Sequence, residues 1–439
     1  ERARKVASQG MVLLENKGAL PIDKSVKTIA LFGNGARRTI KGGTGSGDVN
    51  SRFVVNVEQG LEDAGFSLTT KAWMDTYDTQ VETARMGYFG ELQQEMAAKG
   101  MAAVMKIFTE PFVEPAISGV SQKEIDAMKA DLAIYVLSRN SGEGKDRRAE
   151  KGDYYLSDRE LQNIRFMTEN YSNCVVLLNT GGVIDLTELR KISGVQAILL
   201  TGQTGNMGGH AVADVLMAKT VPSGKLTDTW ARSYDDYPSS RTFSYRDDNL
   251  DDEYYSDGIY VGYRYFDTFN ITPAYEFGYG LSYTDFNIDV KDVTVDEENV
   301  TVDVRVTNVG EKYAGKEVVE VYFSAPDGAL EKPYQELATY GKTDTLAPGE
   351  SQELTLSYAT TEMSSYSQDL AAYVMENGDY VVRVGNSSRN TSVEAVINLD
   401  SNKSYKANMS LELPVGNVVD DGIQSQENTD FKNLVFKRM

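Results

Sequence analysis

The 439-residue sequence predicts an α/β domain with a mostly parallel sheet, followed by an all-β sandwich. In the first half, short apolar runs alternate with segments of helical periodicity. From about Thr284 to Leu399, apolar and polar residues alternate and turn residues separate the runs. With 41% hydrophobic and 25% charged residues, the composition is that of a globular chain long enough for two or three cores.

Four short apolar runs predict the strands of the α/β domain. Each is bounded by polar or glycine residues, as the strands of a parallel sheet buried on both faces should be. The runs are Thr28–Gly33, Leu132–Ser138, Cys174–Asn179 and Val195–Leu200. The N-terminal residues 1–16 have instead the pattern of an amphipathic helix.

Two of the helices between these strands have a recognisable start. Ser121 with Glu124, and Ser157 with Glu160, have the spacing of a capping box, in which each side chain satisfies a free backbone N–H. The stretch 71–118 is rich in Met, Ala and Glu, and it predicts one or two helices that interrupt the strand–helix alternation.

Changes in composition divide the chain into four parts. Residues 1–233 form the predicted α/β domain and 284–400 the β-sandwich. Between them, 234–283 are dense in Tyr and Asp and predict an extended connection whose rings lie over neighbouring surfaces. Residues 401–439 carry weak patterning and are predicted to be a linker or an arm.

The charge of the chain excludes several partners. It has 44 Lys and Arg against 65 Asp and Glu, a net charge of −21, which argues against nucleic acid or an anionic membrane as the main partner. A neutral ligand fits this balance. No apolar run reaches the length of about 18 residues that a membrane span needs. The absence of a visible signal peptide fits a bacterial cytoplasm, and a secreted protein stays open.

Cysteine and histidine are each present only once. A single cysteine, Cys174, leaves no disulfide framework within the chain and no Cys-based zinc cluster. His210 is the only histidine, so an internal Ser-His-Asp triad or a multi-histidine metal site would have to use it. We expect it to be structural or exposed.

The most suggestive loop runs from Arg139 to Arg147, directly after a predicted strand. Ligand sites of open α/β sheets lie outside the carboxyl ends of the strands. Glu143 stands between two glycines, which can project its side chain outward. Such a carboxylic acid could protonate a leaving-group oxygen. The alternative is a solvent-exposed glutamate, or one paired with Lys145 or Arg147.

Two glycine-rich loops also follow predicted strands. Residues 41–48 lack the residue order of a phosphate-binding loop, and Gly33-Asn34-Gly35 lacks the third glycine of a dinucleotide fingerprint. We therefore expect 41–48 to approach a ligand or a neighbouring domain. The loop 201–210 precedes a helix and would present backbone N–H groups at its start.

Several of these segments together resemble glycoside hydrolase family 3, the β-glucosidase family. The resemblance covers roughly residues 5 to 400. It is carried, in this order, by VASQGMVLLENKGALPI, IALFGNGA, GGTGSGDVN, SRNSGEGKDRRAEKGDYYLSDRE, GQTGNMGGHAVADVLMAKTVPSGKLTDTW and VGYRYFDTFNITPAYEFGYGLSYTDF. It implies that the first of these segments is the opening helix and strand of the α/β domain, and that the second domain is a fibronectin type III-like β-sandwich.

The resemblance implies a retaining β-glycosidase that hydrolyses terminal β-D-glucosyl residues, with no metal or organic cofactor. By its place in the motif, Glu143 corresponds to the general acid/base. The family's nucleophile is an aspartate in a Ser-Asp-Trp motif on a (β/α)8 barrel, and no such motif occurs in these 439 residues. The order of domains is similar to that of permuted members. We therefore expect the barrel to lie outside this chain, in cis or on another chain, and the chain alone to be inactive.

Sugar recognition would then be shared with the barrel. The side chains of this chain expected in the wall for the leaving group, or in the domain interface, are Asp146, Arg147, Thr44, Ser46 and Asp48. One alternative keeps the family but changes the sugar: a β-xylosidase, α-arabinofuranosidase or β-N-acetylglucosaminidase. Another is a non-catalytic module for sugar binding or assembly. A homo-oligomer stays open.

Overall fold

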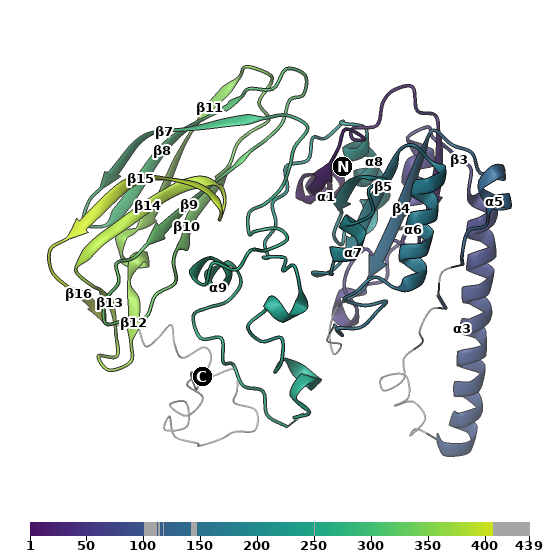
Figure 1. The fold of residues 1–439 in the computed structure, drawn as a ribbon, viewed down its shortest axis with the longest axis horizontal. Coiled ribbons are helices and arrows are strands. Elements are labelled where there is room, and N and C mark those ends of the chain that lie inside the picture. Colours follow the sequence, from purple (N-terminus) through teal and green to yellow (C-terminus); the bar gives the residue numbers. More distant parts are fainter. Residues whose placement is uncertain (101–111, 113–114, 117, 142–146, 250, 407–439) are drawn as a thin grey trace. The chain divides into compact units, whose positions relative to one another are not determined.

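The structure is a computed structural model, and it describes residues 1–100, 112, 115–116, 118–141, 147–249 and 251–406. The chain divides into two compact units, Glu1–Thr220 and Val221–Met439 (Figure 1). The first is the α/β domain and the second contains the sandwich. The boundaries at residues 233, 283 and 400 stay predictions.

The first unit is built on a six-stranded sheet with the order β1-β6-β5-β4-β2-β3. All neighbouring strands are parallel except β1, which is antiparallel to β6. The strands are β1 (Val12–Asn16), β2 (Thr28–Phe32), β3 (Ser67–Leu68), β4 (Leu132–Arg139), β5 (Cys174–Thr180) and β6 (Val195–Leu200). The four predicted strands are confirmed, each with both ends within one residue.

The N-terminus differs from the single helix that its periodicity predicts, and agrees with the opening helix and strand that the resemblance implies. Only Arg2–Gly10 is helical (α1), and residues 12–16 form strand β1. Met11 and Leu13 are completely buried, and Leu13 pairs with Leu199 of β6. An apolar run that meets a strand edge gains both burial and a hydrogen-bonded ladder, and this outweighs the local helical periodicity.

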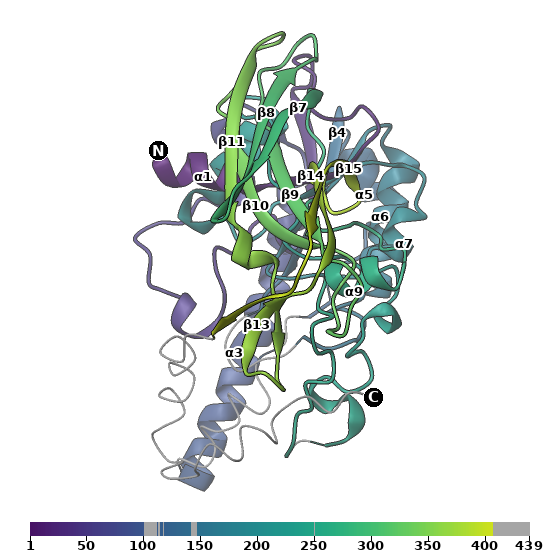
Figure 2. The same cartoon turned by 90° about the vertical axis from the view of Figure 1, so that its left-hand side faces the viewer.

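Helices flank this sheet, and both predicted capping boxes, Ser121–Glu124 and Ser157–Glu160, are confirmed. Residues 71–99 form one continuous helix, whose C-terminal half leaves the body of the unit in both views (Figures 1 and 2). The helices are α2 (Val57–Asp63), α3 (Lys71–Lys99), α5 (Gln122–Ala127), α6 (Asp158–Asn170), α7 (Thr187–Arg190) and α8 (Gly208–Leu216). Across the described part of the chain, every helix is too short or too polar to span a bilayer.

The second unit begins with an irregular segment held by aromatic contacts. Its short helix α9 (Tyr263–Thr268) was not predicted. The Tyr263 ring lies 4.9 Å from that of Phe277 and 5.9 Å from that of Tyr322, measured between ring centroids. The backbone N–H of Trp230 also donates to the backbone carbonyl of Tyr275 at 2.9 Å. Such contacts between rings fix a chain segment that has little regular secondary structure.

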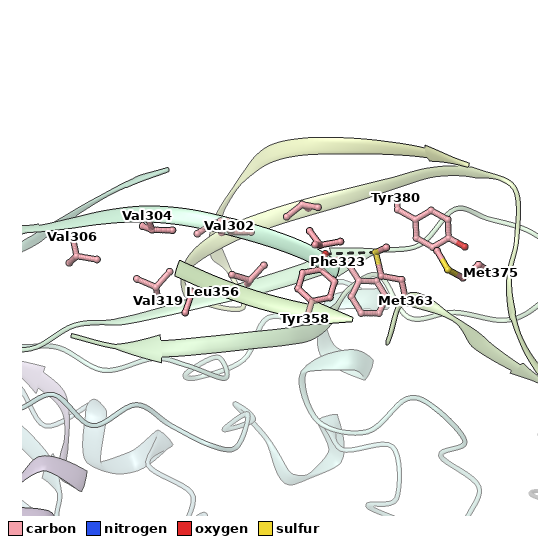
Figure 3. Close-up of a cluster of buried hydrophobic side chains, with 14 of the residues drawn as sticks. Val302, Val304, Val306, Val319, Phe323, Leu356, Tyr358, Met363, Met375 and Tyr380 are labelled. Carbon is pink, nitrogen blue, oxygen red and sulfur yellow. Dashed lines mark hydrogen bonds between the residues drawn. The ribbon is translucent and has the colours of Figure 1, made fainter. Parts of the chain in front are cut away.

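The sandwich follows with sheets ordered β10-β9-β14-β15 and β11-β8-β7, and a small sheet β12-β13-β16. Valines of β8 and β9 and Tyr380 of β14 fill its core (Figure 3). This confirms the all-β prediction. The strands are β7 (Phe286–Val295), β8 (Asn299–Asn308), β9 (Val318–Ser324), β10 (Glu336–Lys342), β11 (Ser351–Ala359), β12 (Ser365–Ser367), β13 (Ala372–Met375), β14 (Gly378–Ser387), β15 (Asn390–Leu399) and β16 (Lys403–Lys406). Of the predicted arm, residues 407–439 lie outside the described residues.

Candidate active site

The carboxyl ends of the parallel strands meet at one edge of the first unit, and Asn179 organises that edge. This side chain is fully buried near the end of β5. Its carbonyl oxygen accepts from Ile40 N–H at 2.6 Å and from the Ser138 hydroxyl at 2.8 Å. Its amide nitrogen donates to the carbonyls of Ile40 at 3.0 Å and Gly202 at 2.7 Å. All four hydrogen-bonding positions of the amide are therefore filled, and the loops after β2 and β6 are tied to the ends of β4 and β5.

Direct backbone bonds hold the glycine-rich loops to one another. Gly205 N–H donates to the Lys41 carbonyl at 2.8 Å, which joins the loops after β6 and β2. Thr44 N–H donates to the Ser141 carbonyl at 3.4 Å, which joins the loop after β2 to the one after β4. The loops singled out in the sequence are thus neighbours at one edge, although more than 90 residues separate the loop 41–48 from each of the other two along the chain.

The predicted wall residues of the loop after β2 have different environments. Thr44 is half-buried beside Ser141, at the start of a short 3₁₀ turn. Ser46 is exposed. The side chain of Asp48 is 69% exposed and lies 3.4 Å from the Lys41 ammonium. The structure therefore brings Thr44 to the base of the loop after β4 and leaves Ser46 and Asp48 at the surface.

A buried ion pair anchors the start of the loop after β4. Arg139, the last residue of β4, is 7% exposed, and Glu160 on α6 is 6% exposed. Their two hydrogen bonds measure 2.8 Å (Nη1 to Oε1) and 2.6 Å (Nη2 to Oε2). Glu160 also accepts from Ser157 N–H at 2.7 Å, so the capping box and the ion pair share one carboxylate. The planar guanidinium fixes both partners in orientation.

A second ion pair anchors the end of that loop. Arg147 Nε bonds the Asp153 carboxylate, and Arg147 Nη2 donates to the Asp153 carbonyl at 2.9 Å. Arg139 Nε donates to the same carbonyl at 3.0 Å, so both anchors meet at Asp153. Glu143 and Asp146 lie outside the described residues, between these two anchors.

Residues that the sequence analysis did not select also contribute to the edge. Gly181 follows β5, and a Cβ atom placed on it would lie within 3.0 Å of both Ser141 Oγ and Gln203 Nε2. Gln203 lies in the loop after β6, which the glycine pattern had identified. Asn179 and Glu160 carried a weaker signal: a polar residue near the end of an apolar run, and the last position of a capping box.

Cysteine and histidine offer no catalytic group at this edge. Cys174 is completely buried at the start of β5, and burial raises the pKa of its thiol to about 12. His210 Nε2 lies 2.7 Å from the Asp63 carboxylate, at the contact of α8 with α2. No group of three or more His, Cys, Asp or Glu side chains is placed to hold a metal ion in the ranges that the structure describes.

The described residues of this edge can support recognition by hydrogen bonds, and the Asp153 and Glu160 carboxylates are both paired with arginines. Two arginine anchors fix the flanks of the Glu143 loop, and hydroxyl and amide groups from the other loops lie beside its first residues.

Comparison with known proteins identifies the two domains. The Glycosyl hydrolase family 3 C-terminal domain matches residues 11–283, and the Fibronectin type III-like domain matches residues 317–388. Beta-glucosidase A of Butyrivibrio fibrisolvens is 36% identical over 89% of this chain and 50% of its own length. A beta-glucosidase of Ruminococcus albus is 35% identical over 92% of this chain and 41% of its own length.

Solved structures agree with these relatives. Beta-glucosidase 3B from Thermotoga neapolitana in complex with alpha-D-glucose superposes with a TM-score of 0.80 and 38% identity. The match covers 92% of this chain and 54% of that one. The chain thus spans about half the length of the relatives it matches. Because the family domain alone accounts for residues 11–283, more than half of the sequence, the chain belongs to glycosyl hydrolase family 3.

Proposed function

We propose that this chain is the acid/base-bearing part of a retaining β-glucosidase that removes terminal β-D-glucosyl residues. The observation that carries the proposal is the loop after β4, at the carboxyl edge of the sheet, both ends of which are anchored by arginine contacts. Arg139 and Arg147 hold its two flanks on Asp153 and Glu160. A general acid must be held within hydrogen-bonding reach of the oxygen that it protonates, and such anchors provide that positioning.

Glu143 acts in both halves of the proposed reaction. As an acid it protonates the glycosidic oxygen while the nucleophile attacks the anomeric carbon. As a carboxylate it then takes a proton from the water that hydrolyses the glycosyl-enzyme intermediate. The nucleophile comes from a (β/α)8 barrel domain, either in the same polypeptide or on another chain. Both halves use carboxyl groups alone.

The leaving group lies against this chain, and the glycone against the barrel. We assign the leaving-group wall to Asp146, Arg147, Thr44, Ser46 and Asp48. The bond between Thr44 and Ser141 supports the place of Thr44, and the anchoring on Asp153 supports that of Arg147. Asp48 is exposed and ion-paired, which equally suits a domain interface.

Glucose is the favoured glycone because the named relatives that cover most of this chain are β-glucosidases. A panel of aryl β-glycosides on the enzyme assembled with its barrel domain tests this choice. Hydrolysis of the β-glucoside should exceed that of the β-xyloside and the N-acetylglucosaminide. A reversed order would replace glucose with the preferred sugar.

The assembled enzyme with Glu143→Gln tests the acid/base assignment. Loss of a general acid lowers the rate by about 10²–10⁴-fold on substrates with poor leaving groups. Azide should partly restore activity on activated aryl glucosides, since a small anion can attack the intermediate without a base. Glu150→Gln is the matched control, because Glu150 is an exposed glutamate only seven positions away. Equal activity of the Glu143→Gln variant and the control would refute the assignment.

A further inference from the structure

Four unpaired polar atoms lie together at the carboxyl edge of the first unit. Two of them are N–H donors, Gln203 Nε2 and Arg147 Nη1, and two are the hydroxyls of Thr180 and Thr204. All four atoms are shielded from solvent, and none has a hydrogen-bond partner among the residues that the structure describes. Buried polar groups are nearly always paired, so a group of such atoms at one place needs an explanation. Asn179, at the same edge, shows that full pairing is achievable there.

The two N–H donors belong to one small surface, formed by Gly181 and Gly182 after β5. Gln203 Nε2 and Ser141 Oγ lie so close to Gly181 that any side chain there would displace them. Arg147 Nη1 lies 3.9 Å from the position that a Cβ of Gly182 would take. Gly181 itself is exposed, so this surface is open on one side. We call these two glycines with Ser141, Arg147 and Gln203 the diglycine surface.

We propose that Gln203, together with Arg147, binds hydroxyl oxygens of the leaving-group sugar at the diglycine surface, and so makes Gln203 a specificity-determining residue. This inference rests on the proposed function. The free atoms are donors, and they require acceptors. A neutral polyhydroxylated ligand supplies acceptors, whereas the net charge of −21 opposes the approach of an anion.

The place of the surface in the chain favours the leaving group over the glycone. Ser141 and Arg147 flank the loop that carries the proposed acid, and this acid protonates the oxygen between the two parts of the substrate. Groups that adjoin the acid's loop on the side of this chain therefore face the departing part. A site built to pair with a hydroxyl group discriminates strongly against a leaving group that lacks one.

The first test compares two leaving groups on the assembled enzyme carrying Gln203→Leu. Cellobiose leaves a glucose with several hydroxyls, whereas 4-nitrophenyl β-glucoside leaves an aryl group. Removing one donor to a neutral acceptor should lower kcat/KM for cellobiose about threefold to tenfold relative to the aryl glucoside. Gln162→Leu, at an exposed glutamine on α6, is the matched control and should leave this ratio unchanged.

A second variant and a second readout separate recognition from folding. Gly181→Ala should displace Gln203 and lower the same ratio, while the unfolding midpoint shows whether the unit stays folded. Transfer of glucosyl to a sugar acceptor, relative to hydrolysis, should fall in both variants because the acceptor occupies the leaving-group position.

Three results would overturn the inference. An unchanged cellobiose-to-aryl ratio with Gln203→Leu would mean that a water molecule alone pairs the amide. An equal loss on both substrates would assign Gln203 to the fold or to the positioning of the loop. A wild-type enzyme that hydrolyses no β-glucoside would refute the proposed function together with this inference. The first two results, by contrast, refute only the role of Gln203.

Discussion

The carboxyl edge of the α/β sheet and the interior of the sandwich are packed by different means. At the edge, amides, hydroxyls and a buried ion pair determine how the loops meet, and several polar atoms stay unpaired. In the sandwich, Val300, Val302, Val304 and Val306 alternate along β8 with no more than 1% exposure and pack into an apolar cluster, while the buried carboxyl groups of Glu320 and Glu376 lie outside this cluster. Polar pairing thus organises the edge, and apolar contacts organise the centre of the sandwich.

This difference indicates a division of labour. Apolar packing is non-directional and tolerant, so it suits a domain whose main requirement is to stay folded. Hydrogen bonds and bidentate ion pairs fix orientation, and unpaired donors are useful only where a ligand will pair them. The two tryptophans allow the regions to be followed separately, because Trp73 lies in the first unit and Trp230 in the second, and both are buried.

The largest effect should come from Arg139→Leu. It leaves the Glu160 carboxylate buried without its partner, and breaking such a pair costs about 3–5 kcal/mol of unfolding free energy. Urea unfolding of a Trp230→Phe background, followed by Trp73 fluorescence, should show this loss. In a Trp73→Phe background, Trp230 should report an unchanged second unit.

An exposed ion pair on the sandwich is the matched control. Arg305 Nη2 and Glu353 Oε1 lie 2.6 Å apart on neighbouring strands, but their side chains are 47% and 69% exposed. Solvent screens such pairs, so Arg305→Leu should cost no more than about 1 kcal/mol, and less at high salt. Equal losses of unfolding free energy for Arg139→Leu and Arg305→Leu would show that burial does not increase the contribution of the Arg139–Glu160 pair to stability.

A pair of reciprocal substitutions should have intermediate effects of opposite sign. Val302→Thr places an unpaired hydroxyl in the sandwich core and should lower the stability of the second unit by about 1–3 kcal/mol. Thr180→Val removes an unpaired hydroxyl at the edge and should raise the stability of the first unit by up to about 1 kcal/mol. The same urea experiments measure both. A destabilising Thr180→Val would mean that this hydroxyl is already satisfied, which would weaken the contrast.

The last effect concerns Cys174, which is silent at neutral pH and appears only at alkaline pH. Burial raises the pKa of this thiol from 9.0 to about 12. The folded unit therefore holds the proton more tightly than the unfolded chain, and this contribution is complete below pH 9 and lost between pH 9 and 12. The first unit of the wild type should lose stability over that range faster than Cys174→Ala does. Parallel curves for the two proteins would contradict the shift.

The local sequence pattern was sufficient to predict those elements in which one kind of interaction dominates. The strand at Cys174–Thr180 is an apolar run, and the helix that begins after Ser157 carries its own cap, so both were predicted within one residue. The N-terminus was predicted as a helix because its periodicity is helical, but residues 12–16 joined β6 through partners almost 190 positions away. Such pairing leaves no mark on the local sequence.

The candidate site follows the same rule. The loops were predicted from their glycines and from their places after strands, and the role of Glu143 came from resemblance alone. Asn179, Asp153 and Gln203 were not found, because the partners that give them meaning, such as Ile40, Arg147 and Gly181, come from other loops.

The sequence by itself determined the two fold classes, four central strands of the first sheet, two helix caps and the family, since these depend on periodicity, on spacing and on order along the chain. The tertiary structure alone decided which polar side chains meet at the carboxyl edge and which of them remain unpaired. The physical reason is that a hydrogen bond depends on distances of a few tenths of an ångström between distant residues, whereas burial depends mainly on the kind of side chain.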